Sequence, residues 1–318
     1  MTHALLQQHL AAYLGLRKAL GCPIISNTKW LESFIAFLNG SEQTPDQPVS
    51  SRLVFDWLDA SMSPDASSLN RSRRLSMIRQ FLEYLSASDP NTQTPEPGLF
   101  ASYKRPKPFL FTNEELEKVL AEAAQWKAGD FSSVVLHTAI GLIAATGLRA
   151  SEALGLDRND VMPRDRPGTL LIRDSKFGKS RLVPLHPSVQ RQLSTYAGHR
   201  ELLGYGADTP AFFVSRHRRR LSYATLSGAF AEIIRRLGIR ARNGSRSPTL
   251  HSLRHTFAVT RLRVWHEEGV DVKTRLGHLA TYLGHIDFRE TFWYVTSTPE
   301  LLVTATAAFL PPRELGGE

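Results

Sequence analysis

The segments HSLRHTFA (residues 251–258) and YLGHIDFRETFWYV (residues 282–295) decide the fold of this chain. The first is predicted to be helical, so that His251, Arg254 and His255, which stand three and four residues apart, share one helix face. Two histidines at this spacing can bind zinc when a glutamate follows the first and another ligand completes the site. Neither that glutamate nor a further ligand set is apparent. We therefore expect no metal site here.

The second segment places Tyr294 in an aromatic run, nine residues after His285. Taken alone, such a tyrosine is more often a packed side chain with a hydrogen-bonded hydroxyl than a nucleophile. The triplet Leu283-Gly284-His285 is also weak by itself, because Leu276-Gly277-His278 repeats it nearby. Neither feature predicts chemistry without the rest of the chain.

Two upstream segments complete the pattern. ATGLRASEALGL (145–156) places Arg149 where a helix restarts after a glycine, with Glu152 one turn further on. Glu152 either orients an active-site group or occupies a plain surface position. DSKFGKSRLVPLH (174–186) is typical of a β-hairpin. Its Gly-Lys-Ser triplet lacks the earlier glycine of a phosphate-binding loop, so it predicts no nucleotide site.

These four segments resemble the conserved boxes of the tyrosine recombinase, or phage integrase, family, in the family's order and at fitting separations. The resemblance is firm over about residues 111–310. It is weaker over residues 1–100, which look like the family's core-binding domain. The catalytic residues that the resemblance implies are Arg149, Lys176, His251, Arg254, His285 and the nucleophile Tyr294.

The resemblance implies a site-specific DNA recombinase or integrase that cleaves and rejoins DNA through a 3′-phosphotyrosyl intermediate, without metal, ATP or another cofactor. A free phenol has a pKa near 10, so Tyr294 needs a base. His251 is expected to serve, acting directly or through the phosphate. His285 would hydrogen-bond a phosphate oxygen, and Lys176 would protonate the departing 5′-hydroxyl. The hairpin has Phe177 where the family usually has glycine, which leaves Lys179 as an alternative to Lys176.

Two other functions stay open. A type IB topoisomerase shares the chemistry but relaxes supercoils without a partner site, and a catalytically inactive regulator would only bind DNA. The core-binding-like region and long tail argue against the first, and the six intact candidate residues argue against the second. The closing YLGH…TFWYV…TPELL sequence looks like that of integrases of transposable elements.

The predicted fold is mainly α with a small β-sheet, in an α+β catalytic domain. Residues 1–98 are expected to form a helical core-binding domain, 99–110 a linker and 111–318 the catalytic domain. Within the last, a capping box at Thr112 and Glu115 predicts a helix start. Helices are expected near 131–146, 187–203, 222–237, 251–268, 271–283 and 298–309, with strands at 169–173 and 181–185.

Charge is distributed unevenly along the 318 residues, whose formal net charge is +9. Residues 1–100 contain 8 basic and 9 acidic side chains, and the remainder contains 31 and 21, so the excess lies after residue 100. Such an excess favours a polyanionic partner, although a merely basic surface gives the same sum. The candidate contacts to double-stranded DNA are Arg71, Arg73, Arg74, Lys104, Arg105, Lys107, Arg216, Arg218, Arg219 and Arg220.

Assembly and location follow from the same reasoning. The resemblance implies a homotetramer on two duplexes, with other recombinases or accessory proteins as further partners. The predicted helix 298–309 packs either into a neighbouring protomer or onto its own domain. Cys22 is the only cysteine, and no secretion signal or membrane span is expected. We therefore expect a cytoplasmic bacterial protein that associates with the nucleoid when active.

Overall fold

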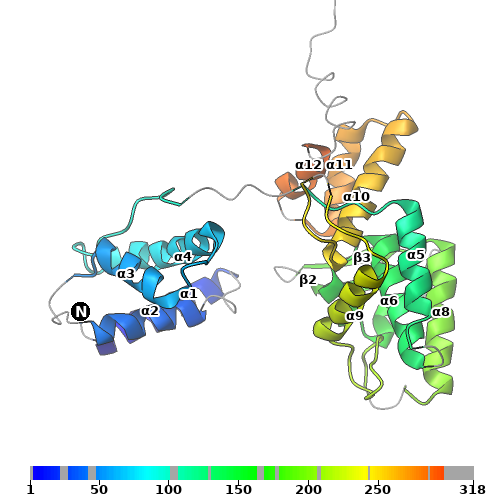
Figure 1. Ribbon diagram of the computed structural model, residues 1–318, viewed down its shortest axis with the longest axis horizontal. Coiled ribbons are helices and arrows are strands. Elements are labelled where there is room, and N and C mark those ends of the chain that lie inside the picture. Colours follow the sequence, from blue (N-terminus) through cyan, green and yellow to red (C-terminus); the bar gives the residue numbers. More distant parts are fainter. Residues whose placement is uncertain are drawn as a thin grey trace, which may run out of the picture. The chain divides into compact units, whose positions relative to one another are not determined.

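The computed structural model describes residues 3–21, 28–41, 48–100, 107–127, 130–162, 168–175, 179–205, 209–242, 244–285 and 287–296. The chain forms two compact units, Met1–Arg105 and Pro106–Glu318 (Figure 1). No helix in the described ranges is long and apolar enough to cross a membrane.

The first unit is a small helical bundle. Its helices are α1 (His3–Ala19), α2 (Thr28–Gly40), α3 (Ser51–Ser61) and α4 (Ser68–Ser86). Each helix contributes apolar residues at helical spacing to one core, in which Phe34 packs edge-on against Trp57 at 5.5 Å. The apolar stripe of α4 is buried there, including Ile78 and Phe81.

The second unit is mainly helical with a small sheet, which confirms the predicted fold class. Its helices are α5 (Asn113–Ala124), α6 (Phe131–Thr146), α7 (Ala150–Gly155), the 3₁₀ turn η1 (Arg158–Asp160), α8 (Pro187–Leu202), α9 (Tyr223–Arg236), α10 (Leu250–Glu267), α11 (Val272–Leu283) and α12 (Phe288–Thr296). The strands β1 (Val161–Met162), β2 (Thr169–Ser175) and β3 (Lys179–Pro184) form an antiparallel sheet in the order β1-β2-β3.

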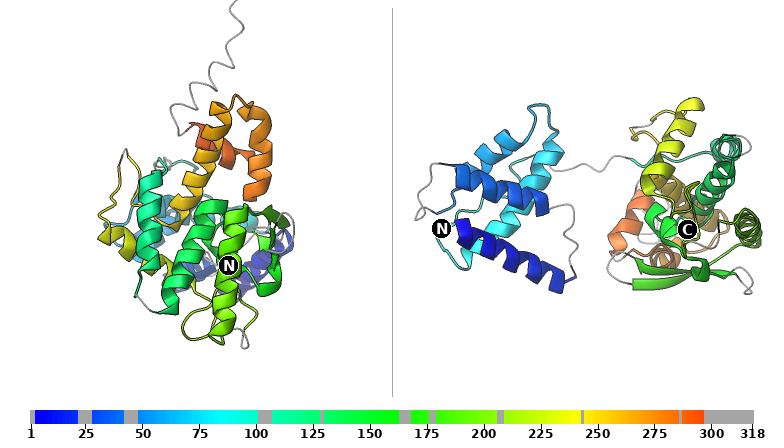
Figure 2. Two further views of the ribbon diagram at one scale, coloured as in Figure 1. Left: turned by 90° about the vertical axis from the view of Figure 1, so that its right-hand side faces the viewer. Right: turned by 90° about the horizontal axis from the view of Figure 1, so that it is seen from below.

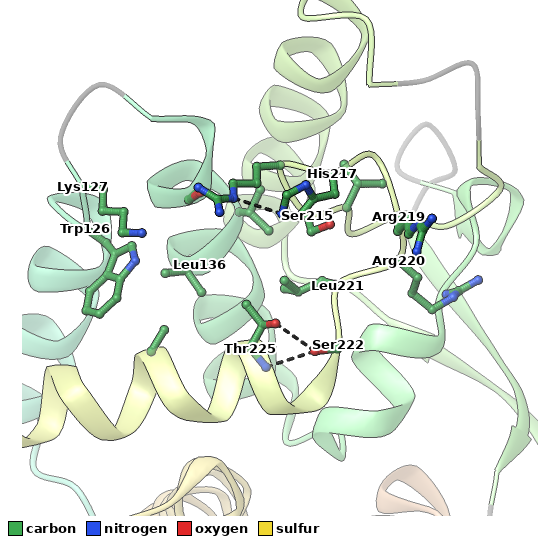
Figure 3. Close-up of a pocket in the computed structure, with 15 residues that line it drawn as sticks. Trp126, Lys127, Leu136, Ser215, His217, Arg219, Arg220, Leu221, Ser222 and Thr225 are labelled. Carbon is green, nitrogen blue, oxygen red and sulfur yellow. Dashed lines mark hydrogen bonds between the residues drawn. The ribbon is translucent and has the colours of Figure 1, made fainter.

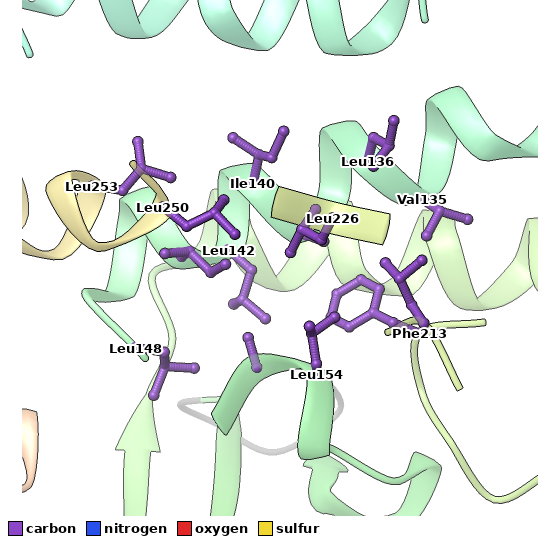
Figure 4. Close-up of a cluster of buried hydrophobic side chains, with 14 of the residues drawn as sticks. Val135, Leu136, Ile140, Leu142, Leu148, Leu154, Phe213, Leu226, Leu250 and Leu253 are labelled. Atoms are coloured by element: carbon purple, nitrogen blue, oxygen red, sulfur yellow. The ribbon is translucent and has the colours of Figure 1, made fainter. Parts of the chain in front are cut away.

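Helix α6 lies at the centre of the second unit's core. Ten of its 16 residues are buried, because it is apolar on nearly every side and is surrounded by other elements. Figure 4 shows Leu136, Ile140 and Leu142 of this helix facing side chains from α7, α9 and α10. The core therefore holds the end of α6 and the starts of α7 and α10 in fixed positions. Arg149 directly precedes α7, and Arg254 lies in the first turns of α10.

The last three helices form a smaller cluster. α11 and α12 lie next to each other and both contact α10, at one end of the unit (Figures 1 and 2). Their shared apolar core includes Leu262, Leu279 and Tyr294. Helix α12 and the short strand β1 were not predicted, whereas the predicted helix 298–309 lies outside the described residues.

Candidate active site

Arg254 lies in the interior, between two helix ends. Its side chain is 1% exposed. Its Nη1 donates to the carbonyl oxygen of Gly147 at 2.9 Å, and its Nη2 donates to that of Leu283 at 2.8 Å. These residues follow α6 and end α11, where helix carbonyls lack intrahelical partners and carry partial negative charge. The two helix ends therefore orient the planar guanidinium.

The charge of Arg254 is retained despite this burial. Burial and the nearby charge of Arg149 lower the pKa of Arg254 to about 10, while Tyr294 and Glu152 act in the opposite direction. A pKa of about 10 still leaves the guanidinium charged at neutral pH. The interior thus contains a fixed cation, as a site for a phosphate requires.

Arg149 caps the N-terminus of α7 and is held by Glu152. The Arg149 backbone N–H donates to Oε2 of Glu152 at 2.9 Å, and its Nη1 donates to Oε1 at 2.9 Å. Its Nη2 also donates to the carbonyl oxygen of Gly284 at 3.3 Å. The Arg149 side chain is 21% exposed and that of Glu152 only 6%. Glu152 is therefore a buried orienting residue, and the plain surface position considered for it is wrong.

Gly147 and Gly284 shape the backbone between these arginines. Both have positive φ values, +64° and +69°. A Cβ at Gly147 would lie 2.5 Å from Cδ1 of Phe257, and a Cβ at Gly284 would lie 2.7 Å from Nη1 of Arg181. A residue with a Cβ would strain the backbone at both positions, and at Gly147 it would also collide with the Phe257 ring, so both positions favour glycine.

His285 follows α11 and faces α12. Its Nδ1 lies 2.6 Å from the hydroxyl oxygen of Thr291, and its Nε2 lies 3.7 Å from Oε2 of Glu290. Glu290 in turn lies 4.0 Å from Nη2 of Arg149. The His285 ring is stacked 6.2 Å from the ring of Tyr294. These contacts fix the orientation of the imidazole beside Tyr294, and Glu290 links it to Arg149.

Tyr294 is buried on α12, and its hydroxyl contacts His255. Its side chain belongs to the core, with 1% of the residue exposed. The hydroxyl lies 3.1 Å from Nδ1 of His255. The exposed His251 packs edge-on against His255, with ring centroids 4.4 Å apart. The two histidines therefore form a path from the solvent to the phenol. Their shared helix face was predicted, but a role for His255 was not.

Some predicted site residues fall outside the described part of the chain. Lys176 is one, and the side chain of its alternative Lys179 is also outside it. So are Lys104 and Arg105, whereas Lys107 is exposed and forms an isolated bridge with Ser245. The two strands that flank the hairpin turn, β2 and β3, are antiparallel, with Leu170 opposite Val183.

Two of the predicted DNA-binding arginines of the first unit, Arg71 and Arg74, bond to other groups within that unit. Nη1 of Arg71 donates to Asp59 at 2.6 Å. Arg74 donates to the carbonyl and hydroxyl oxygens of Ser61 and lies 5.2 Å over the ring of Trp30. Arg73 is exposed.

Arg216, Arg219 and Arg220 line a pocket of about 900 Å³ between α6 and α9 (Figure 3). Arg220 at its edge donates to the carbonyls of Leu154 and Leu156 and pairs with Asp157. It therefore holds the loop 214–222 against the end of α7. Its three neighbours, Arg216, Arg218 and Arg219, are exposed.

Comparison with known proteins identifies the family. The family model for the phage integrase family matches residues 110–300. The chain is 32% identical to the putative integrase/recombinase y4rE of Sinorhizobium fredii, over 96% of both chains. It is 30% identical to the tyrosine recombinase XerC of Erythrobacter litoralis, over 92% of this chain and 87% of that one.

The fold has solved counterparts as well. A structure of the XerH site-specific recombinase bound to a palindromic difH substrate, in a post-cleavage complex, matches with a TM-score of 0.67 and 21% identity. The match covers 90% of this chain and 79% of that chain. With its matching fold, its family model and its relatives, this chain belongs to the phage integrase family, whose enzymes are tyrosine recombinases.

Proposed function

We propose that this protein is a site-specific DNA recombinase in which Tyr294 attacks a backbone phosphate. The phenolic oxygen forms a bond to phosphorus, the bond from phosphorus to the 5′-oxygen breaks, and a 3′-phosphotyrosyl linkage results. The 5′-hydroxyl of a second duplex then attacks this linkage and releases the tyrosine. The observation that carries the proposal is the gathering of Arg149, Arg254 and His285 around the segment that bears Tyr294.

The arginines supply the electrostatic part of the reaction. The pentavalent transition state places extra negative charge on the non-bridging oxygens, and preorganised cations lower its energy. Arg254 is oriented by two carbonyls and Arg149 by Glu152. Because both are held before DNA arrives, little reorganisation is needed during the reaction. His285 adds a hydrogen bond to a phosphate oxygen.

Proton transfer uses the histidines and a hairpin lysine. The phenol of Tyr294 must lose its proton as the bond to phosphorus forms. His251 was expected to receive this proton, and the contact between His255 and the hydroxyl offers a relay to it. Lys176, or Lys179 as the alternative, would give a proton to the departing 5′-oxygen.

DNA binding would use basic residues of both units. Arg73, Lys107, Arg216, Arg218 and Arg219 are exposed, so DNA phosphates can reach them. Arg71, Arg74 and Arg220 already hold other parts of the chain, and phosphate contacts by them would compete with those bonds. Lys104 and Arg105 belong to the same proposal.

The chemistry sets the number of protomers. Exchange between two duplexes cleaves four strands, and each protomer provides one Tyr294. Four protomers on two duplexes are therefore proposed, with the segment 298–309 as the candidate exchanged element. Truncation after residue 297 should then lower the fraction of tetramer on DNA in analytical ultracentrifugation. We further propose action in the bacterial cytoplasm, at the nucleoid, for an integrase of a transposable element.

A nicked suicide duplex tests the proposal. The wild-type protein should yield a covalent protein–DNA adduct on a denaturing gel, and Tyr294→Phe should yield none while binding DNA with nearly unchanged affinity. A variant that cleaved at the wild-type rate would show that another residue is the nucleophile. Absence of an adduct with the wild-type chain would favour a DNA-binding regulator instead. Relaxation of supercoils without exchange between two sites would favour a topoisomerase.

A further inference from the structure

Arg181 on β3 connects three parts of the active site. Its Nη1 and Nη2 donate to Oε1 and Oε2 of Glu152 at 3.1 and 2.9 Å, a two-pronged ion pair. Its Nε donates to the carbonyl oxygen of Tyr282 at 2.8 Å. The Arg181 side chain is 12% exposed and that of Glu152 6%. This arginine therefore joins the hairpin to α7 and to the end of α11.

The geometry around Arg181 is tight. A Cβ at Gly284 would lie 2.7 Å from its Nη1 and 2.9 Å from its Cζ. The turn that leads from α11 to His285 thus passes directly over the guanidinium. Because the same turn presents the Gly284 carbonyl to Arg149, a displacement of Arg181 would move a partner of Arg149 as well.

Glu152 is the residue through which Arg181 can act. Burial opposes ionisation of this carboxyl, but hydrogen bonds from Arg181 and from the Arg149 backbone outweigh it, and the pKa of Glu152 lies below its ordinary value. The charged groups that face Glu152 are Arg149 on its own helix, Arg181 on β3 and Arg254 on α10, whose Nη1 lies 4.0 Å away. Glu290 of α12 faces the far side of Arg149 at 4.0 Å.

We propose that Arg181 is a positioning residue of the recombination reaction, which holds and orients Glu152 so that Glu152 aims Arg149 at the phosphate. Its bond to the Tyr282 carbonyl fixes the turn that carries His285 at the same time. The proposal rests on the proposed function, since it assigns a role in strand cleavage.

The test compares Arg181→Gln with Arg173→Gln. Arg173 also lies on the hairpin and pairs with a buried carboxylate, that of Asp160, but it stands outside this network. Single-turnover cleavage of a suicide duplex should fall about 10- to 100-fold in Arg181→Gln, because a small displacement of catalytic groups costs that much. DNA affinity should change less than threefold. Arg173→Gln should cleave within about threefold of the wild type, even where its melting temperature falls.

The pH profile separates positioning from general destabilisation. Without Arg181, the pKa of Glu152 should rise, so that Glu152 becomes protonated at a higher pH than in the wild type. The acid limb of the cleavage rate should then move to higher pH in Arg181→Gln, but not in Arg173→Gln. Arg181→Lys retains a positive charge without the planar fork. Its acid limb should lie near that of the wild type, while its rate remains reduced.

A double-mutant cycle tests the path through Glu152. The double variant Glu152→Gln, Arg181→Gln should lose little more activity than either single variant, because both substitutions disrupt the same ion pair. Additive losses, or wild-type cleavage by Arg181→Gln, would overturn the inference while leaving the proposed function intact. A wild-type chain that forms no adduct would instead overturn the proposed function, so the two failures are distinguishable.

Discussion

The hydroxyl of Tyr294 lies 3.1 Å from Nδ1 of His255, and both residues are buried. The proposed nucleophile is thus held inside its own unit by a residue that can also accept its proton. His251, the base expected from the resemblance, packs edge-on against the His255 ring. The second histidine of HSLRH therefore requires its own test.

Substitution of His255 should impair cleavage more than DNA binding. In His255→Leu the hydrogen bond is lost, and we expect the rate of adduct formation to fall at least about tenfold, as for loss of a group that assists proton transfer. His255→Asn places an amide near the position of Nδ1 and should retain more activity. His266→Leu, at an exposed position on the same helix, is the control. Equal rates for all three variants would remove His255 from the mechanism.

Arg254→Lys should be severely impaired. One ammonium cannot donate to the carbonyls of Gly147 and Leu283 and still present a planar pair of N–H groups to a phosphate. Loss of one such transition-state donor typically lowers the rate about 100- to 1,000-fold. Single-turnover cleavage measures this loss. Arg240→Lys, at an exposed position of the same unit, should cleave like the wild type.

Gly147→Ala should destabilise the second unit. The positive φ and the 2.5 Å approach to Phe257 both oppose a Cβ, and together should cost at least about 2 kcal/mol. Gly228→Ala, on α9 with open space around the position, should instead stabilise by about 0.5–1 kcal/mol. Urea unfolding of both variants measures the difference. Equal stability would show that the turn after α6 does not require glycine.

Alkaline pH should unfold the protein partly through Tyr282. Burial raises the pKa of Tyr282 to about 12, so the folded state favours its neutral phenol. The neutral Tyr282 phenol contributes its full stabilisation at pH values below about 10, the pKa of the phenol in the unfolded chain. This contribution is lost as the pH rises towards 12. Tyr282→Phe should therefore make the free energy of unfolding fall less steeply between pH 10 and 12. Tyr223→Phe, at an exposed position, should not.

Local signals predicted most of the fold. The capping box at Thr112 and Glu115 is present, and α6 runs over 131–146 as expected. Helix α12 was missed because Thr, Phe, Trp, Tyr and Val, which fill all of 291–295, favour strands in isolation. Its packing against α10 and α11 outweighs this local preference.

The site was predictable only in part. Arg149, Arg254, His251 and His285 were selected through the resemblance of their motifs to the family's, whereas Arg181 and His255 were not selected. The partners of Arg254 could not, since its carbonyl acceptors lie 107 and 29 residues away in the chain and become neighbours only through packing. The ion pair of Arg181 with Glu152 spans 29 residues for the same reason. A single sequence contains no local signal for such contacts.

The two carbonyl partners of Arg254 have a consequence for newly synthesised protein. Its guanidinium is oriented only when the turns after α6 and at the end of α11 have both come together. The ribosome must therefore synthesise the chain to the end of α11 before Arg254 can be oriented by both carbonyls. Under the proposed function, incomplete or unfolded copies would not cleave DNA, because Arg254 is oriented only in the finished tertiary structure.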